Sequence, residues 1–245
     1  MPASKEDTVG ELVAERPERA RVFERLGIDY CCGGKQTLAA ACAQLGLSPE
    51  TVLAQLESAA ASSVAAGEAA PASLTLTALC EQIVQLHHAY LRETLPRLHE
   101  LARKVTTVHR PAHPELEQVR EVFEELWMEI ENHIDQEERL LFPACRQLEA
   151  TLRPVDLSCG SLGAAVVRLE HEHSDAGEAL TLLRSLTDGY GPPPDACPSY
   201  RSLLEGLHDL ESDLHQHIHK ENNILFLRAM ALDAALRGSG AGPSR

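Results

Sequence analysis

The stretch His217-Ile-His-Lys-Glu221, followed by Ile224-Leu225-Phe226, decides the fold. Almost the same pattern occurs 84 residues earlier, where His133-Ile-Asp-Gln-Glu137 precedes Leu140-Leu141-Phe142. Such an echo indicates an internal duplication. Residues four apart lie on one face of a helix, so each copy places an imidazole beside a carboxylate on a stripe that should face a core. Because an unpaired charge there would be costly, the pattern predicts a bound metal.

The composition excludes several classes of protein. The chain has 245 residues and a formal net charge of -15, with 22 Lys and Arg against 37 Asp and Glu. It therefore lacks a basic patch for phosphates, and nucleic acid is not an expected partner. The N-terminus has no apolar signal segment, and no run of about 18 apolar residues could span a membrane. With seven cysteines that do not resemble a secreted disulfide framework, the chain is predicted to be cytoplasmic, with reduced thiols.

From residue 77 onward, apolar residues recur in alternating steps of three and four, which is typical of amphipathic helices. Four such segments with short to medium connections predict an all-α fold, an up-down-up-down four-helix bundle over residues 74–237. Pro96 predicts a kink near residues 92–95, and Pro143 should bend or end the second helix. The four stripes include Leu91, Leu95 and Leu98; Val119, Phe123 and Leu126; Leu180 and Leu183; and Leu203, Leu207 and Leu210.

Register along these stripes selects the candidate metal ligands. Each half of the duplication contributes one histidine and then a His-x3-Glu pair, and the two single histidines are 85 residues apart. The six candidates are His88, His133, Glu137, His173, His217 and Glu221. The remaining histidines are expected to be solvated: His87, His99, His109, His113, His171, His208, His215 and His219.

Counting donors indicates the metal. If Glu137 and Glu221 both bridge two ions, each ion has two imidazoles and two carboxylate oxygens, and a bridging oxygen makes five donors. Mixed imidazole and carboxylate ligation with open positions suits iron or manganese, whereas a structural zinc site is disfavoured because no thiolate is in register. We therefore predict two iron ions with an oxo or hydroxo bridge.

Two glutamates lie close to the predicted ligands. Glu129 precedes His133 by one helical turn, and Glu172 directly precedes His173. Either carboxylate could orient a ligand imidazole or line a path for ions, and the alternative is a solvated side chain on the flank of the helix.

The first 58 residues predict a separate small helical domain. A capping box begins at Thr8, Pro17 starts a second helix that Gly27 ends, and two more helices should cover residues 37–45 and 50–57. Residues 59–73 are small and polar, which predicts a linker that lets the two domains change position. Residues 238–245 should form a flexible tail.

Cys31 and Cys32 lie in a tight loop of this domain. A disulfide between them is not expected, because adjacent cysteines rarely meet the required geometry. Lys35 and the following helix start predict a lowered thiol pKa, and hence a pair that takes part in transferring iron or electrons, or holds a partner. The alternative is that both are small residues that fill a turn.

The six-residue ligand set resembles that of haemerythrin-like di-iron bundles, over residues 74–237. The run Asp29-Tyr30-Cys31-Cys32-Gly33-Gly34-Lys35 is similar to the small domain that precedes such bundles in the bacterial repair-of-iron-centres family. The resemblance implies a stress-response protein that repairs iron-sulfur clusters damaged by nitric oxide or oxidants. Its clients would be iron-sulfur proteins. The oligomeric state stays open between monomer and homodimer.

The sequence departs from relatives of this kind at two places. Oxygen-carrying haemerythrins use a fifth histidine one turn from the third-helix ligand, but positions 169 and 177 are Leu169 and Gly177, which disfavours oxygen carriage. Leu227 stands where the first repeat has Pro143, which leaves the end of the fourth helix undefined.

Three functions are consistent with this reading. The leading one is a non-enzymatic iron donor that supplies iron to damaged clusters. The second is an enzyme that reduces nitric oxide or peroxide at open coordination positions. The third is a gas or redox sensor in which the bundle controls the N-terminal domain through the linker.

Overall fold

The computed structural model describes residues 3–62, 73–157 and 160–239. The chain divides into two compact units, each made from separate stretches. The first unit comprises residues 1–80, 144–156 and 215–245, and the second comprises residues 81–143 and 157–214. The described residues are mostly helical, so the predicted all-α class is confirmed, and β1 (Asp156–Leu157) and β2 (Gly160–Ser161) form one short pair. None of the described helices is long and apolar enough to cross a membrane.

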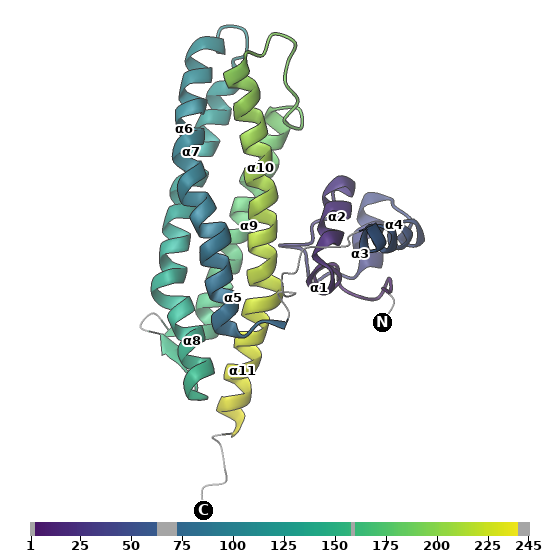
Figure 1. Ribbon diagram of the computed structural model, residues 1–245, viewed down its shortest axis with the longest axis vertical. Coiled ribbons are helices and arrows are strands. Elements are labelled where there is room, and N and C mark those ends of the chain that lie inside the picture. The colour runs from purple at the N-terminus through teal and green to yellow at the C-terminus, as the bar shows by residue number, and fades with distance from the viewer. Residues whose placement is uncertain (1–2, 63–72, 158–159, 240–245) are drawn as a thin grey trace, which may run out of the picture. The chain divides into compact units, whose positions relative to one another are not determined.

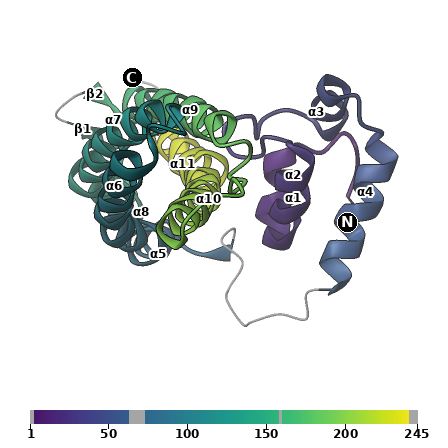
Figure 2. The same cartoon turned by 90° about the horizontal axis from the view of Figure 1, so that it is seen from above.

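The second unit is built around four helices. These are α6 (Ala89–His109), α7 (Glu115–Gln136), α9 (Leu162–Leu186) and the first part of α10 (Pro198–Lys220). Figure 1 shows them side by side, and Figure 2 views them end-on. The turn between α6 and α7 spans only residues 110–114, so these two helices are antiparallel neighbours.

The core of this unit consists of the predicted apolar stripes. Phe123, Leu98, Leu183 and Leu210 are fully buried, one from each of the four helices. Burying a side chain of this size stabilises the fold by about 1.5–3 kcal/mol. The same cluster includes Leu91, Leu95, Val119, Leu126, Leu180, Leu203, Leu207 and Leu214. The period of the sequence therefore predicted both the helices and their buried faces.

Three of the long helices contain a π-helical turn that the sequence did not reveal. These turns are η3 (Val84–His88), η4 (Glu137–Leu141) and η5 (Glu221–Leu225). The first lies between α5 (Leu76–Ile83) and α6. The other two lead into α8 (Phe142–Thr151) and α11 (Phe226–Ser239). Such turns hold an extra residue and occur often at functional sites.

The prolines do not explain these irregular turns. Helix α6 continues through Pro96, and the irregular turn before it is instead at η3. Pro143 is the second residue of α8, so the second helix passes into a π turn rather than ending. The corresponding Leu227 follows an identical π turn, which resolves the undefined end of the fourth helix. The π turns η4 and η5 must therefore have a cause that both repeats share and that does not involve proline.

The N-terminal residues form the predicted short helices: α1 (Val9–Glu15), the 3-10 turn η1 (Pro17–Arg19), α2 (Ala20–Leu26), α3 (Leu38–Leu45) and α4 (Pro49–Ser62). The capping box is present, with Thr8 and Glu11 each accepting a backbone N–H of the other, at 3.2 and 3.1 Å. Gly27 ends α2 with φ of 69°, in the left-handed region that favours glycine.

Helix α4 runs five residues past its predicted end. We expected it to stop at residue 57, but it continues to Ser62, because the Ala-rich segment that follows has high helix propensity. Most of the predicted linker, residues 63–72, and the end of the predicted tail, residues 240–245, lie outside the described residues.

Candidate metal centre

Four of the six predicted ligands belong to the second unit, where each is buried. His88 is the last residue of η3, His133 lies in the last turn of α7, Glu137 begins η4, and His173 lies within α9. His88 and Glu137 are 0% exposed. Burial of a carboxylate among imidazoles calls for a cation to offset its charge.

The two oxygens of Glu137 face different histidines. Oε1 lies 3.3 Å from Nε2 of His133, and Oε2 lies 3.4 Å from Nε2 of His88. Nε2 of His173 lies 2.9 Å from Nε2 of His133, so these two imidazoles and Oε1 converge on one point. A carboxylate that presents one oxygen to each of two histidine groups has the arrangement required of a bridge between two ions.

Outer carboxylates fix the orientation of two of these imidazoles. Nδ1 of His133 donates to Glu172 at 2.7 Å, and Nδ1 of His88 donates to Glu138 at 2.8 Å. Because a carboxylate only accepts, each ring carries its proton on Nδ1 and directs the Nε2 lone pair toward Glu137. Arg92 donates to the same oxygen of Glu138 at 2.8 Å and holds it in place.

The pKa values of these outer carboxylates agree with this arrangement. The bond from His133 lowers the pKa of Glu172. For Glu138, burial raises the pKa, but the hydrogen bonds from Arg92 and His88 outweigh this effect, and the net shift of the pKa is downward.

Glu172 was one of the two residues predicted to orient a ligand imidazole, whereas the other, Glu129, is exposed on α7. Glu138 was missed, although its position directly after Glu137 was a usable signal.

The second His-x3-Glu copy lies in the first unit. His217 is in the last turn of α10 and Glu221 is the first residue of η5, and both are almost completely buried. Nε2 of His217 lies 2.9 Å from Oε1 of Glu221. His217 and Glu221 therefore resemble His133 and Glu137 in two ways: the imidazole lies close to the carboxylate, and the glutamate is the first residue of a π turn.

Two histidines expected to be solvated are buried instead. His87 is 4% exposed, and its Nδ1 donates to Asp213 at 2.8 Å. His219 is also 4% exposed, and its Nδ1 donates to the Tyr30 carbonyl at 3.4 Å. The prediction failed for His87 because it lies in a π turn, which changes the side of the helix on which a residue lies. It failed for His219 because the N-terminal segment covers that side chain. Of the other six histidines that were expected to be solvated, two are exposed, namely His171 and His208. The remaining four are half-buried: His99, His109, His113 and His215.

The Cys31-Cys32 loop lies against this second copy within the first unit. The Asn223 side chain donates to the carbonyls of Cys31 at 2.9 Å and Tyr30 at 3.3 Å. A Cβ added to Gly34 would lie 2.2 Å from Oδ1 of Asn223, so any larger residue there would have to displace the Asn223 side chain. Ile218 completes the contact by joining the apolar core of the N-terminal helices.

The predicted lowering of a thiol pKa in this loop is wrong for Cys31. Its thiol is 5% exposed and donates to Asp29 at 3.3 Å. The hydrogen bond with Cys32, burial and the negative charge of Asp29 all raise the pKa of Cys31. Desolvation and a neighbouring carboxylate outweigh the helix start and Lys35, because both disfavour a thiolate.

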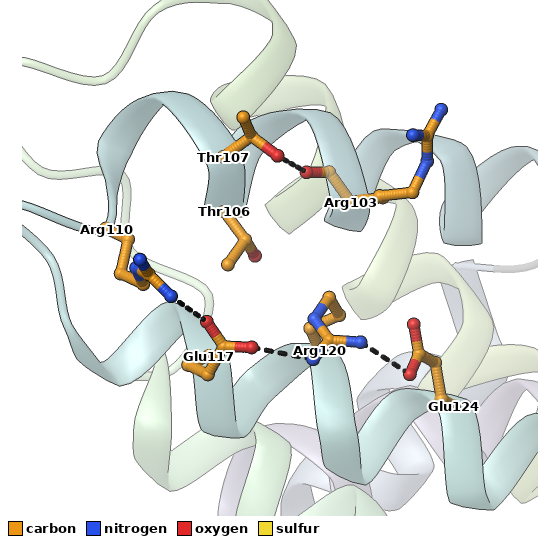
Figure 3. A pocket seen from close by; sticks show the side chains of 7 residues that line it. All are labelled: Arg103, Thr106, Thr107, Arg110, Glu117, Arg120 and Glu124. Carbon is orange, nitrogen blue, oxygen red and sulfur yellow. Dashed lines mark hydrogen bonds and ion pairs between the residues drawn. The ribbon is translucent and has the colours of Figure 1, made fainter.

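A cavity of about 340 Å³ lies beside the turn between α6 and α7 (Figure 3). Four of its five charged side chains pair with one another: Arg120 donates to Glu124 at 2.7 Å and also to Glu117, and Arg110 donates to Glu117 at 3.1 Å. Its lining contains neither histidine nor cysteine: Arg103, Thr106, Thr107, Arg110, Glu117, Arg120 and Glu124. The buried His and Glu residues are therefore the better candidate for a functional site.

Comparison with known proteins places both parts of the chain. Residues 81–229 match the haemerythrin HHE cation-binding domain, and residues 5–60 match ScdA_N, a domain of unknown function (DUF542). The chain is 35% identical over 229 residues to an iron-sulfur cluster repair protein, YtfE, of Pectobacterium atrosepticum, covering 93% of this chain and 98% of the relative. It is also 35% identical over 231 residues to YtfE of Escherichia coli O157:H7, covering 94% and 99%.

Proposed function

Because this chain belongs to the haemerythrin-like family of iron-sulfur cluster repair proteins, we propose that it holds two iron ions and supplies iron to damaged clusters. Its partners would be iron-sulfur proteins whose clusters have been lost to nitric oxide or oxidants. The single observation that carries the proposal is the position of Glu137, whose two oxygens face His133 and His88.

We assign the ligands of the two ions from this position. His133, His173 and one oxygen of Glu137 would hold the first ion, and His88 and the other oxygen would hold the second. His217 and Glu221 would complete the set. Their inclusion rests on register, because Leu214, which belongs to the bundle core, precedes His217 by one turn of the same helix. The family match also covers both copies as one domain.

The donor set suits iron. It combines four imidazoles and two carboxylates, which favour iron or manganese over structural zinc. The two carboxylates would offset part of the metal charge inside the core, and an oxo or hydroxo bridge would complete the pair. When bound, the ions supply the iron that is given up. The chain's own part is to hold the Nε2 lone pairs in position, through the Glu138 and Glu172 bonds to Nδ1.

A cytoplasmic location is part of the proposal. It is supported by the absence of any disulfide among the six described cysteines, as in a compartment that keeps thiols reduced.

Iron transfer is the experiment that tests this function. The protein loaded with iron-57 would be mixed with an apo iron-sulfur protein, sulfide and a thiol reductant, and cluster formation followed by absorption and Mössbauer spectroscopy. We expect iron-57 to appear in the client cluster. Retention of all the iron by this protein, with no cluster formed, would show that it is not a donor.

The same material separates the reductase alternative. Stopped-flow mixing of the reduced protein with nitric oxide and an electron donor measures whether the gas is consumed over many cycles. A donor should bind or consume at most about one equivalent per site. Sustained turnover together with no iron transfer would favour the enzyme.

The Cys31-Cys32 pair enters the proposal as the part that passes iron on or holds the client. Changing both residues to serine should leave the two ions of the proposed di-iron site in place, because none of its six proposed ligands lies in this loop, yet abolish cluster repair. Cys197→Ser is the matched control, since Cys197 is a half-buried thiol outside the N-terminal helices. Full repair by the double variant would return Cys31 and Cys32 to a structural role.

A further inference from the structure

We propose that Asp29, Cys31 and Cys32 form a cation site of their own, which takes up a divalent ion of intermediate softness. The donors are two cysteine sulfurs, which become thiolates when an ion binds, and one carboxylate oxygen, and the three atoms lie within 4.8 Å of one another. Ferrous iron in transit is the cargo expected from the proposed function. The site itself rests only on the geometry of the loop.

The spacing of the donors matches a tetrahedral ion. A metal–sulfur distance of about 2.3 Å and the tetrahedral angle place two sulfur ligands about 3.8 Å apart. Sγ of Cys31 and Sγ of Cys32 are 3.9 Å apart. By the same reasoning a sulfur and an oxygen ligand should be separated by about 3.6 Å. Sγ of Cys31 and Oδ1 of Asp29 are 3.3 Å apart, so an ion needs little rearrangement of the loop.

The loop is held in this form before any ion arrives. Oδ1 of Asp29 accepts the backbone N–H groups of Cys31 at 3.0 Å and Cys32 at 2.9 Å, and Oδ2 accepts that of Gly33 at 2.8 Å. On the other side, Asn223 holds the Cys31 carbonyl at 2.9 Å. A preformed site loses less conformational entropy on binding than an unordered one.

Exposure of the donors gives the ion a way in. Cys31 is buried, Cys32 is half-buried and Asp29 is exposed, so the group opens toward solvent on one side. Three protein donors leave one position of a tetrahedral ion for water or for a ligand from a client. Binding would release one proton from each thiol, so a divalent ion with two thiolates and one carboxylate carries a net charge of -1.

Cobalt(II) is a suitable probe because thiolate coordination gives it charge-transfer absorption. The full chain, first loaded with no more than two iron ions per chain so that only the proposed di-iron site is filled, would be titrated with cobalt(II) chloride under anaerobic conditions. We expect one equivalent to bind with thiolate-to-cobalt absorption. Cys31→Ser, Cys32→Ser should remove the absorption, and Asp29→Asn should weaken binding at least tenfold. Cys197→Ser should leave both unchanged.

Several outcomes would overturn the site. One is thiolate-to-cobalt absorption that persists in the double serine variant, and another is half an equivalent per chain, which would mean an ion shared by two copies. Circular dichroism and iron content check that each variant is folded.

The proposed function can fail independently of this site. If cobalt binds as described but no iron reaches an apo client, the site stands and the donor role does not. If iron transfer is normal while cobalt gives no thiolate absorption, the donor role stands and the Asp29, Cys31 and Cys32 site does not.

Discussion

Asn223 offers the sharpest test of how the Cys31-Cys32 loop is held. Its Nδ2 donates to the carbonyls of Cys31 at 2.9 Å and Tyr30 at 3.3 Å. A hydrogen bond of this kind contributes about 0.5–1.5 kcal/mol net, so Asn223→Ala should weaken the attachment by about 1–3 kcal/mol. Because about 1.4 kcal/mol is a factor of ten, local opening should become roughly 5- to 150-fold more frequent.

Thiol labelling measures this opening directly. Cys31 is 5% exposed, so a thiol reagent reaches it only when the loop opens. Mass spectrometry of labelled peptides gives separate rates for Cys31 and for Cys42, which is fully buried in the same helical domain. We expect Asn223→Ala to speed labelling of Cys31 by the factor above while Cys42 changes little. Equal acceleration at both thiols would indicate unfolding of the whole domain.

Two further variants complete the test. Gly34→Ala should act like Asn223→Ala, because the added Cβ would lie 2.2 Å from Oδ1 of Asn223 and one of the two must move. Asn132→Ala is the matched control, an asparagine exposed on α7. If Asn223→Ala and Gly34→Ala label Cys31 no faster than Asn132→Ala, the loop is not held by this contact.

Three other predictions concern the metal centre and one surface ion pair. His217→Ala should lose far more iron than His219→Ala, measured by elemental analysis, because only His217 is in register; equal iron content would contradict the assignment. Glu137→Ala should lose one iron or the magnetic coupling, and coupled iron in its Mössbauer spectrum would refute the bridge. The bond to Asp195 raises the pKa of His113, so its stabilising effect is present below about pH 6.5 and lost as pH rises through the raised pKa. Asp195→Asn should return that pKa toward its ordinary value in an NMR titration, and an unchanged titration would exclude the pairing.

The bundle and its buried faces were predictable because burial repeats with the helical period. Leu98, Phe123 and Leu210 were placed on core stripes by spacing alone, and each is fully buried. His88 and Glu137 followed from the same stripes, since a polar residue in register with apolar ones shares their burial. Local periodicity carries this information because the helix itself fixes which side chains share a face.

The contacts made by the N-terminal helices were not predictable, because they join segments far apart in the sequence. His219 was expected to be solvated since it lies off the apolar stripe, and it is buried because Tyr30 lies against it. The sequence around Gly34 and around Asn223 does not indicate that the Asn223 side chain packs against the backbone of Gly34. The same limit applies to the pKa of Cys31, which depends on burial by residues outside its loop.

The π turns follow from what the two repeats have in common. In an α-helix, residues five apart point in directions about 140° apart, so a glutamate and a phenylalanine at that spacing could not share one face. Glu137 and Phe142 are nevertheless both fully buried, Oε2 of Glu137 lies 3.4 Å from the His88 ring nitrogen, and Phe142 stacks on that ring at 5.6 Å. An extra residue in the turn brings the two side chains onto the same side. Glu221 and Phe226 have the same spacing, burial and π turn without a proline after them. The burial of a glutamate and an aromatic side chain, five residues apart, in one core therefore accounts for a distortion that the proline does not explain.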